Sequence, residues 1–209
     1  MKISQTLFTT GLSFFVLTAS AQEDASTGRI IDMTQSWTGA IGLEMISISR
    51  QAAREQYIDS SALRLNIEGE YFFTQTLSTT LGMGIISYDD NSSFSQRTED
   101  NFGNVKNSES SANAVPFYAE LGYKRFFSGE ATPYITVRGG FSFIMGSERS
   151  IGNCSNCYSE NIDIDGGMYA LLGAGIVAGD SWSLGLHYKN YLSGDLESGI
   201  GLNISWGNF

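Results

Sequence analysis

The side chains best suited to hydrolytic chemistry gather near the C-terminus, around His187, the only histidine of the chain. Ser193 and Glu197 follow it, so a hydroxyl, a base and an acid lie within one short stretch. A hydroxyl nucleophile needs an adjacent base. A His-x-Ser pair would place a serine hydroxyl beside a histidine base, but Lys189 stands at the second position after the histidine. Because Ser193 falls in the following loop, out of that spacing, the stretch predicts no catalytic triad.

Both cysteines, Cys154 and Cys157, belong to one Cys-x-x-Cys motif in a polar segment. A redox motif of this kind is expected in a βαβ context, which is absent here, and zinc needs four ligands where this motif supplies two. We therefore expect a small disulfide loop, no metal site and no cofactor. The acidic residues that follow, Glu160, Asp163 and Asp165, have the chemistry to bind calcium, with a solvated acidic rim as the favoured alternative.

The elements that must position these residues are β-strands, because apolar and polar residues alternate. The clearest strand runs from Leu63 to Phe73, with Arg64, Asn66, Glu68 and Glu70 on one face. Its period of two excludes an amphipathic helix, whose period is 3.6. The core of a soluble sandwich would not accept three charges in four consecutive inward positions, so the opposite, apolar face is expected to meet lipid.

The same alternation recurs along the chain and predicts an even number of strands. They are expected from Trp37, at 63–73, 77–85, 115–124, 134–143 and 168–177, and in a closing hairpin over 182–189 and 199–206. Long polar loops are expected at Gln51–Ser60, Asp89–Ala114 and Gly146–Asp165, in alternation with short turns. The pattern is typical of an all-β fold, an eight-stranded antiparallel up-and-down transmembrane β-barrel with short periplasmic turns and longer extracellular loops.

The N-terminus has the pattern of an export signal. Lys2 precedes the apolar run Leu7–Leu17, and Ala19-Ser20-Ala21 is a small-x-small cleavage site, so residues 1–21 are predicted to be a signal peptide. A membrane anchor is the alternative, but it needs a run of about twenty apolar residues. Residues 22–36 are interpreted as a flexible periplasmic segment, and residues 37–209 as the barrel domain. The net charge of −10 argues against nucleic acid and other polyanions as partners.

The inward-facing positions carry four acidic and four basic side chains, together with the histidine. They form the predicted polar network of the lumen: Glu44, Arg64, Glu68, Glu70, Glu120, Lys124, Arg138, His187 and Lys189. An eight-stranded barrel is just wide enough for its own side chains. Because unpaired charges are costly in a poorly hydrated interior, the balance favours a salt-bridged plug over independent charges in a water channel.

Aromatic residues on the outward faces lie toward the strand ends, as in the interfacial girdles of membrane barrels. The turn-side girdle is predicted to comprise Trp37, Tyr71, Phe73, Phe126, Phe127, Trp182, Trp206 and Phe209. The loop-side girdle is predicted to comprise Tyr88, Phe143 and Tyr191.

Three segments carry a resemblance to a known family: Thr132–Phe143 (TPYITVRGGFSF), Leu184–Leu196 (LGLHYKNYLSGDL) and the C-terminal GLNISWGNF. Over residues 37–209 the chain resembles the small eight-stranded outer-membrane barrels of Gram-negative bacteria, the OmpA/OmpX-type and outer membrane protein β-barrel domain families. The resemblance implies residence in the cell outer membrane, contact with its lipid and lipopolysaccharide, and a C-terminal strand read by the barrel assembly machinery. Since Trp206 is out of phase with Phe209, we expect a bulge or a frayed end near Gly207 and Asn208.

We therefore expect a monomeric, non-enzymatic barrel with a structural or surface-recognition role that displays its extracellular loops to an unidentified surface ligand. The main alternative is a narrow channel or carrier for small solutes. A lipid A-modifying enzyme is less favoured, because lipid A deacylases of similar size place a His-x-Ser pair near the closing hairpin, where this chain has Lys189 after His187.

Overall fold

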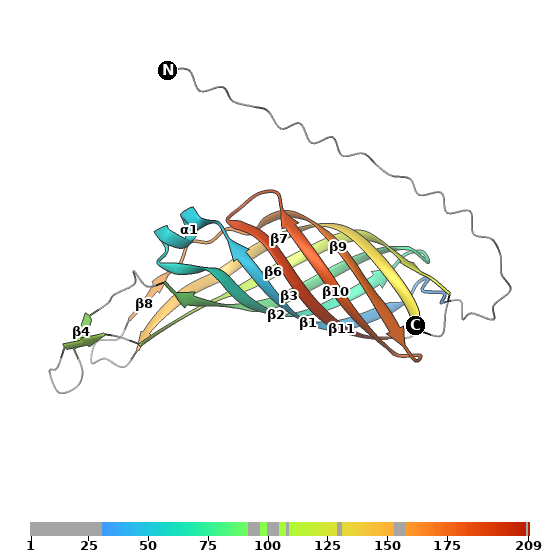
Figure 1. Ribbon diagram of the computed structural model, residues 1–209, viewed down its shortest axis with the longest axis horizontal. Coiled ribbons are helices and arrows are strands. Elements are labelled where there is room, and N and C mark those ends of the chain that lie inside the picture. Colours follow the sequence, from blue (N-terminus) through green and yellow to red (C-terminus); the bar gives the residue numbers. More distant parts are fainter. Residues whose placement is uncertain are drawn as a thin grey trace, which may run out of the picture.

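The computed structural model describes residues 31–91, 97–99, 105–107, 109–128, 131–152, 158–207 and 209. Within them, eight long antiparallel strands close into a barrel, which confirms the expected fold (Figure 1). These are β1 (Trp37–Ile48), β2 (Ile58–Phe72), β3 (Leu77–Asp90), β6 (Glu109–Phe126), β7 (Thr132–Gly152), β9 (Gly167–Ala178), β10 (Trp182–Tyr191) and β11 (Leu196–Gly207). The short strands are β4 (Arg97–Glu99) and β5 (Val105–Asn107), which pair with each other, and β8 (Tyr158–Asn161), which pairs with β7.

The first and last strands form the seam that closes the barrel. β1 pairs with β11 in antiparallel register from Thr38 opposite Gly207 inward, with Leu43 opposite Leu202. At the other side of the sheet, β6 pairs with β7 along almost its whole length. Closure leaves no unpaired edge in the barrel wall, as a strand structure in lipid requires.

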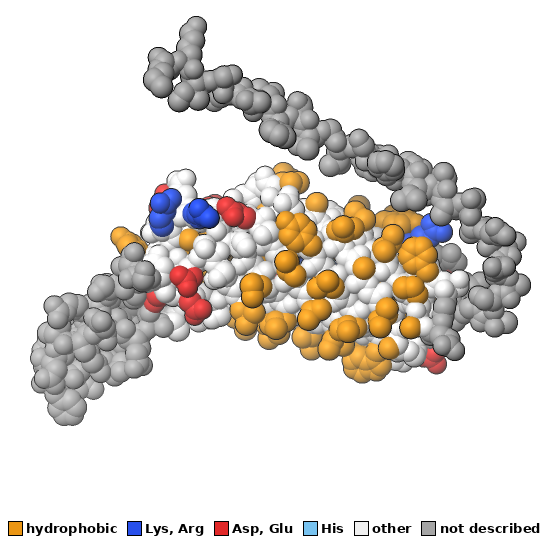
Figure 2. All heavy atoms as spheres, viewed as in Figure 1, with side chains coloured by type: hydrophobic (Ala, Val, Ile, Leu, Met, Phe, Trp, Pro, Cys, Tyr) orange, Lys and Arg blue, Asp and Glu red, His pale blue; other side chains and the backbone are white. Residues whose placement is uncertain are grey.

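Apolar side chains cover the outside of the barrel wall. Ile41 and Leu43 on β1 and Leu184 on β10 are exposed, whereas the residues that alternate with them along each strand face inward. Figure 2 shows hydrophobic side chains spread over the barrel wall on this face and charged side chains at its two ends. Such a continuous apolar surface is typical of a lipid-facing barrel. In the part of the chain that the structure describes, no helix is long and apolar enough to cross a membrane.

Short turns connect the strands at the end of the barrel that holds the C-terminus (Figure 1). In the β2–β3 turn, the Thr74 hydroxyl oxygen accepts hydrogen bonds from the backbone N–H groups of Thr76 and Leu77, at 3.3 and 3.0 Å. The β9–β10 turn places Gly179 at φ +67°, a left-handed conformation that glycine adopts without steric cost.

The opposite end is more ordered than the sequence predicts. The expected loop Gln51–Ser60 instead contains the helix α1 (Arg50–Glu55), and β2 already begins at Ile58. The Ser49 hydroxyl caps this helix by accepting the Ala52 N–H at 3.2 Å, and two buried alanines anchor it to the mouth of the barrel. A capping serine is only a weak sequence signal for a helix, and the polar composition of this segment favoured a loop instead.

The other two long loops are also shorter than predicted. β6 begins at Glu109 and β7 runs to Gly152, so both strands continue into the expected loops Asp89–Ala114 and Gly146–Asp165. This extension has paired backbones, for example Asn113 opposite Glu148. Backbone pairing does not require the alternating apolar pattern on which the prediction depended, because outside the membrane both faces can meet water.

The C-terminus corrects one part of the sequence-based interpretation. Pairing of β11 with β1 runs without a shift from Met45 opposite Ile200 to Thr38 opposite Gly207, so β11 has no bulge within these paired residues, and the frayed end expected at Asn208 lies outside the described residues. Phe209 is 8% exposed, so it does not belong to the aromatic girdle. The predicted signal peptide at 1–21, residues 22–30, Cys154 and Cys157 lie outside the described residues.

Candidate functional site

The centre of the lumen holds a cluster of charges around Glu44. The register places Glu44 of β1 directly opposite Arg64 of β2, and their side chains form an ion pair in which both are 0% exposed. From β10, Lys189 Nζ lies 3.3 Å and His187 Nε2 3.5 Å from the same carboxylate oxygen, Glu44 Oε2. One carboxylate therefore serves as the counter-charge of two buried cations and contacts the histidine.

A second cluster lies toward the short-turn end. Arg138 of β7 bridges two carboxylates, with Nη2 2.8 Å from Glu70 Oε1 and Nη1 2.9 Å from Glu120 Oε2. Lys124 of β6 also pairs with Glu70. Lys189 lies 3.7 Å from Glu120 and so joins this cluster to the first. The result is one connected network of buried ion pairs, which is stable only when each charge is compensated.

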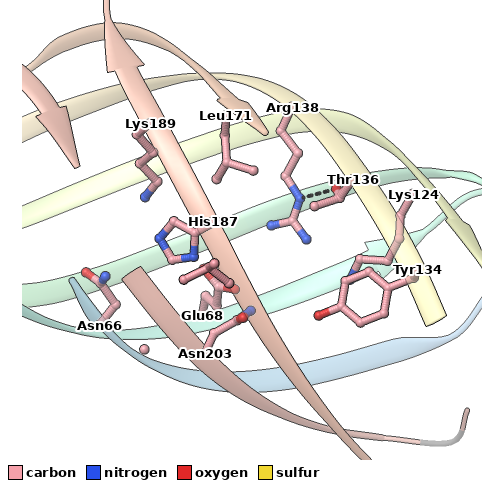
Figure 3. A pocket seen from close by; sticks show the side chains of 12 residues that line it. Asn66, Glu68, Lys124, Tyr134, Thr136, Arg138, Leu171, His187, Lys189 and Asn203 are labelled. Atoms are coloured by element: carbon pink, nitrogen blue, oxygen red, sulfur yellow. Dashed lines mark hydrogen bonds between the residues drawn. The ribbon is translucent and has the colours of Figure 1, made fainter. Parts of the chain in front are cut away.

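All the residues predicted for the lumen network point into the barrel. Figure 3 shows Glu68, Lys124, Arg138, His187 and Lys189 converging from different strands. Glu68 differs from the other acids, because its carboxylate accepts a hydrogen bond from the Tyr118 hydroxyl at 2.9 Å instead of forming a described ion pair.

The structure keeps apart the residues that a hydrolytic triad would bring together. His187 lies inside the lumen against Glu44. The Ser193 hydroxyl oxygen instead accepts a hydrogen bond from the Met168 N–H at 3.0 Å, in the loop outside the membrane. Among the described residues, no group of three or more histidine, cysteine, aspartate or glutamate side chains is arranged to hold a metal ion.

Aromatic rings cover the buried lysines. Lys189 Nζ lies 4.8 Å from the ring centre of Tyr118 and 5.1 Å from that of Tyr169. The rings of Phe72 and Tyr134 enclose Lys124 in the same way, at 5.3 and 5.0 Å. Cation–π contacts of this kind are strongest where water is excluded, so they reinforce the ion pairs while they fill space.

An apolar plug, which the sequence analysis missed, closes the lumen toward the long loops. Its core includes Ile46, Ile48, Ala52, Ala53, Ile58, Ile86, Tyr88, Ile162, Ile164 and Tyr191. Tyr88 and Tyr191 are thus buried inside, which corrects their placement in the loop-side girdle. One signal was available, since Ile46 and Ile48 continue the inward phase of Glu44 beyond the polar layer.

A second apolar plug closes the short-turn end. It consists of Ile31, Met33, Phe72, Tyr134, Val177 and Phe209, with Phe126 packed against it. The Phe126 ring therefore lies inside the barrel end, which corrects its placement in the turn-side girdle. Residues 31–36 were predicted to be flexible, but Met33 is 0% exposed and the Gln35 N–H bonds the Phe72 carbonyl at 2.9 Å. The reason is that two apolar residues alternate with Asp32 and Thr34 and cap the barrel end.

Between the two plugs, little free space remains. A cavity of about 20 Å³ lies among residues that include Asn66, Glu68, His187, Lys189 and Asn203 (Figure 3). This is room for about one water molecule. The lumen is therefore a packed interior in three layers, apolar at both ends and charged in the middle.

Outside the membrane, Arg149 connects several long-loop segments. Its side chain, nearly buried, lies 2.8 Å from Asp90 at the end of β3 and also pairs with Glu160 of β8. Its second Nη donates to the backbone carbonyls of Gln56 and Tyr57 after α1, at 2.6 and 3.4 Å. Because one guanidinium joins three connections, these segments form a common platform. No spacing in the sequence indicated this role.

At the short-turn rim, the outward aromatic residues form two groups. The ring centres of Trp37 and Tyr71 lie 4.8 Å apart, and those of Tyr71 and Phe73 lie 5.2 Å apart. Trp182 and Trp206 lie 6.4 Å apart. Their positions at one end of the apolar surface agree with an interfacial belt.

The fold and the filled lumen define a small transmembrane β-barrel. Residues 9–207 match the family described as outer membrane protein beta-barrel domain. The chain belongs to this family and is an outer-membrane protein.

Several solved structures resemble the chain at low sequence identity. Ail of Yersinia pestis is 10% identical, with a TM-score of 0.48, over 85% of this chain and 100% of Ail. Neisserial surface protein A is 11% identical, with a TM-score of 0.42, over 82% and 94% of the two chains. OprG of Pseudomonas aeruginosa is 9% identical, with a TM-score of 0.40, over 84% and 94%. No curated protein matches the sequence.

Proposed function

We propose that this protein is a non-conducting, non-enzymatic outer-membrane scaffold that displays a fixed extracellular surface. The observation that carries the proposal is the lumen, which is filled by side chains from one plug to the other. A pore for ions or solutes needs a continuous hydrated path. The cavity among the central charges has a volume of only about 20 Å³, which is room for about one water molecule.

The ion pairs of the lumen serve stability and not transport in this proposal. Each charge of a transport path must exchange its partner for a passing ion. Here Arg138 is held by two carboxylates at 2.8 and 2.9 Å and by the Thr80 hydroxyl at 3.0 Å. Releasing such a side chain would expose unpaired charges in a dry interior, which costs several kilocalories per mole.

The display role follows from the platform around Arg149. Binding sites on rigid elements lose less conformational entropy on binding than sites on mobile loops. The cation ties the segment after α1, the end of β3 and β8 into one body. We propose that an unidentified surface ligand is recognised there, by a monomeric barrel that contacts outer-membrane lipid and lipopolysaccharide and whose C-terminal strand is recognised by the assembly machinery.

A polyanion is not the ligand that this surface favours. Ail has been solved in complex with the heparin analogue sucrose octasulfate. The present chain has a net charge of −10, so long-range attraction of a polysulfate is unfavourable. The ligand of Ail is therefore not extended to this protein.

The test is conductance in planar lipid bilayers. The refolded full chain should show negligible steady conductance. A matched positive control removes bulk from the network and from both plugs together (Arg138→Ala with Phe72→Ala and Tyr88→Ala) and should leak measurably. Steady conductance of the unmodified protein, blocked by a solute that enters the lumen, would establish the channel alternative. Incubation with lipopolysaccharide should release no acyl chains, and their release would identify an enzyme.

A further inference from the structure

Two arginines on α1 form no ion pair with any carboxylate in the part of the chain that the structure describes. Arg50 and Arg54 are exposed and lie one helical turn apart. Arg54 Nε donates to the Arg50 carbonyl at 3.0 Å, which holds the second guanidinium over the first turn. Among the described residues, neither guanidinium has a carboxylate within ion-pair distance. Glu55, on the same helix, instead accepts a hydrogen bond from the Gln51 amide at 3.0 Å.

The arginines border a groove between α1 and the start of β2. The groove has a volume of about 390 Å³. The nearly buried residues Ala53 and Ile58 lie at its floor, and Asp59 supplies one carboxylate. Two like charges at this helical spacing destabilise a helix slightly, so their side-by-side placement is better explained by a ligand than by helix stability.

The groove lies at the height of the lipid headgroups. The outermost apolar pair on the lipid face of β1 and β2 is Met45 opposite Leu63. Asp59 is four residues beyond Leu63, which places it within about 10 Å of the edge of the apolar band for a tilted strand. Figure 2 shows Lys or Arg side chains on this face at α1, beyond that band. The polar headgroup region of a bilayer begins at the same level.

We propose that Arg50 and Arg54 bind a phosphate group of an outer-leaflet lipid headgroup in this groove. Guanidinium groups match the oxygens of a phosphate and form charge-assisted, bidentate hydrogen bonds to it. The buried side chains of Ala53 and Ile58 form the floor beneath the phosphate and hold the helix in place. The inference deepens the proposed lipopolysaccharide contact and rests on the extracellular position of α1, but it does not depend on whether the lumen conducts.

The experiment titrates the full-length barrel in detergent micelles with diphosphorylated lipid A and measures affinity by microscale thermophoresis. The variant Arg50→Gln with Arg54→Gln should weaken binding at least tenfold, because two charge-assisted contacts are lost. Asp59→Asn should strengthen binding several-fold by removing repulsion of the phosphate. Arg125→Gln, which removes an exposed arginine at the opposite end of the barrel, is the matched control and should bind normally.

Three further results bear on the identity of the ligand. Dephosphorylated lipid A should bind the unmodified protein and the double variant equally weakly. Inorganic phosphate that binds as tightly as lipid A would overturn the headgroup assignment. Unchanged affinity in the double variant, or weaker binding after Asp59→Asn, which would indicate a cation site, would also refute the proposal. Heat-dependent gel mobility verifies that each variant is folded, and the conductance test addresses the scaffold role separately.

Discussion

Replacement of Glu44 by glutamine should destabilise the barrel by about 3–5 kcal/mol, because it removes the counter-charge of buried cations. Arg64 is fully buried beside this carboxylate, and Lys189 lies 3.3 Å from it. The substitution conserves shape and hydrogen-bonding capacity, so the measured loss of unfolding free energy reports the charge and not a cavity.

The size of this destabilisation depends on which counter-charges Lys189 and Arg64 keep after the substitution. A pair of charges 3.3 Å apart, as for Lys189 and Glu44, attract by about 5 kcal/mol at an effective dielectric constant of 20. Lys189 keeps a second carboxylate, Glu120, at 3.7 Å. Arg64 keeps the Tyr191 hydroxyl at 3.2 Å, but within the described part of the chain it has no second carboxylate. Most of the loss therefore comes from Arg64, which stays buried without a counter-charge.

A double variant is the matched control. Arg64→Met alone should also cost several kilocalories per mole, because it breaks the ion pair and leaves the buried Glu44 carboxylate with Lys189 as its counter-charge. The combination Glu44→Gln with Arg64→Met restores charge balance and should cost less than either single change. The assay is urea unfolding in phospholipid vesicles, followed by tryptophan fluorescence. Trp37, Trp182 and Trp206 all lie at the short-turn rim and report loss of the folded barrel.

Two results would refute this reasoning. A cost below about 1 kcal/mol for Glu44→Gln would mean that the charge is solvated, as for surface ion pairs. Costs that simply add in the double variant would mean that the two residues act independently. Either result would indicate a water-filled lumen and would support the channel alternative.

Three other substitutions probe the platform, the seam and the short-turn plug. Arg149→Met should leave the barrel folded but speed protease cleavage of the long-loop segments, measured by mass spectrometry. Gly39→Val should lower the folding yield, measured by gel mobility, because a Cβ at Gly39 would lie 2.7 Å from Trp206 ring atoms at the closing seam; adding Trp206→Ala should restore it. Phe209→Ala should cost about 3 kcal/mol in urea unfolding, as for other buried phenylalanines.

Each of these substitutions has an outcome that would contradict the structure. Cleavage of the Arg149→Met variant at the rate of an Arg125→Met control would show that the platform does not depend on this cation. Normal folding of Gly39→Val would show that the indole of Trp206 is free to move aside. An unchanged stability of Phe209→Ala would place that ring outside the barrel.

The barrel itself was predictable because side-chain direction in a strand has a period of two. In β2, the alternation of Leu63 and Leu65 with Arg64 and Asn66 assigns each residue to lipid or lumen without any knowledge of its neighbours. The even strand count matched that of closed bacterial barrels, and the inward phase predicted the charged lumen. The sequence alone thus predicted the fold and the charged residues that face inward.

The alternation could not predict the structure of segments that lie outside the lipid-facing part of the barrel wall. β6 and β7 extend into water, where backbone pairing continues without an apolar face. Residues 31–36 are too short and too polar to signal a plug, although Met33 is completely buried. Phe209 was assigned to the girdle by residue type, but it is buried in the plug at the short-turn end.

Only the tertiary structure decided which groups meet. Glu70 and Arg138 are far apart in the sequence, yet they lie 2.8 Å apart across the lumen. Arg149 reaches backbone carbonyls of a helix end that the sequence did not predict. Alternation determines the face on which a side chain lies, whereas its partner depends on strand register, barrel closure and the path of the loops, which are set by contacts distant in sequence.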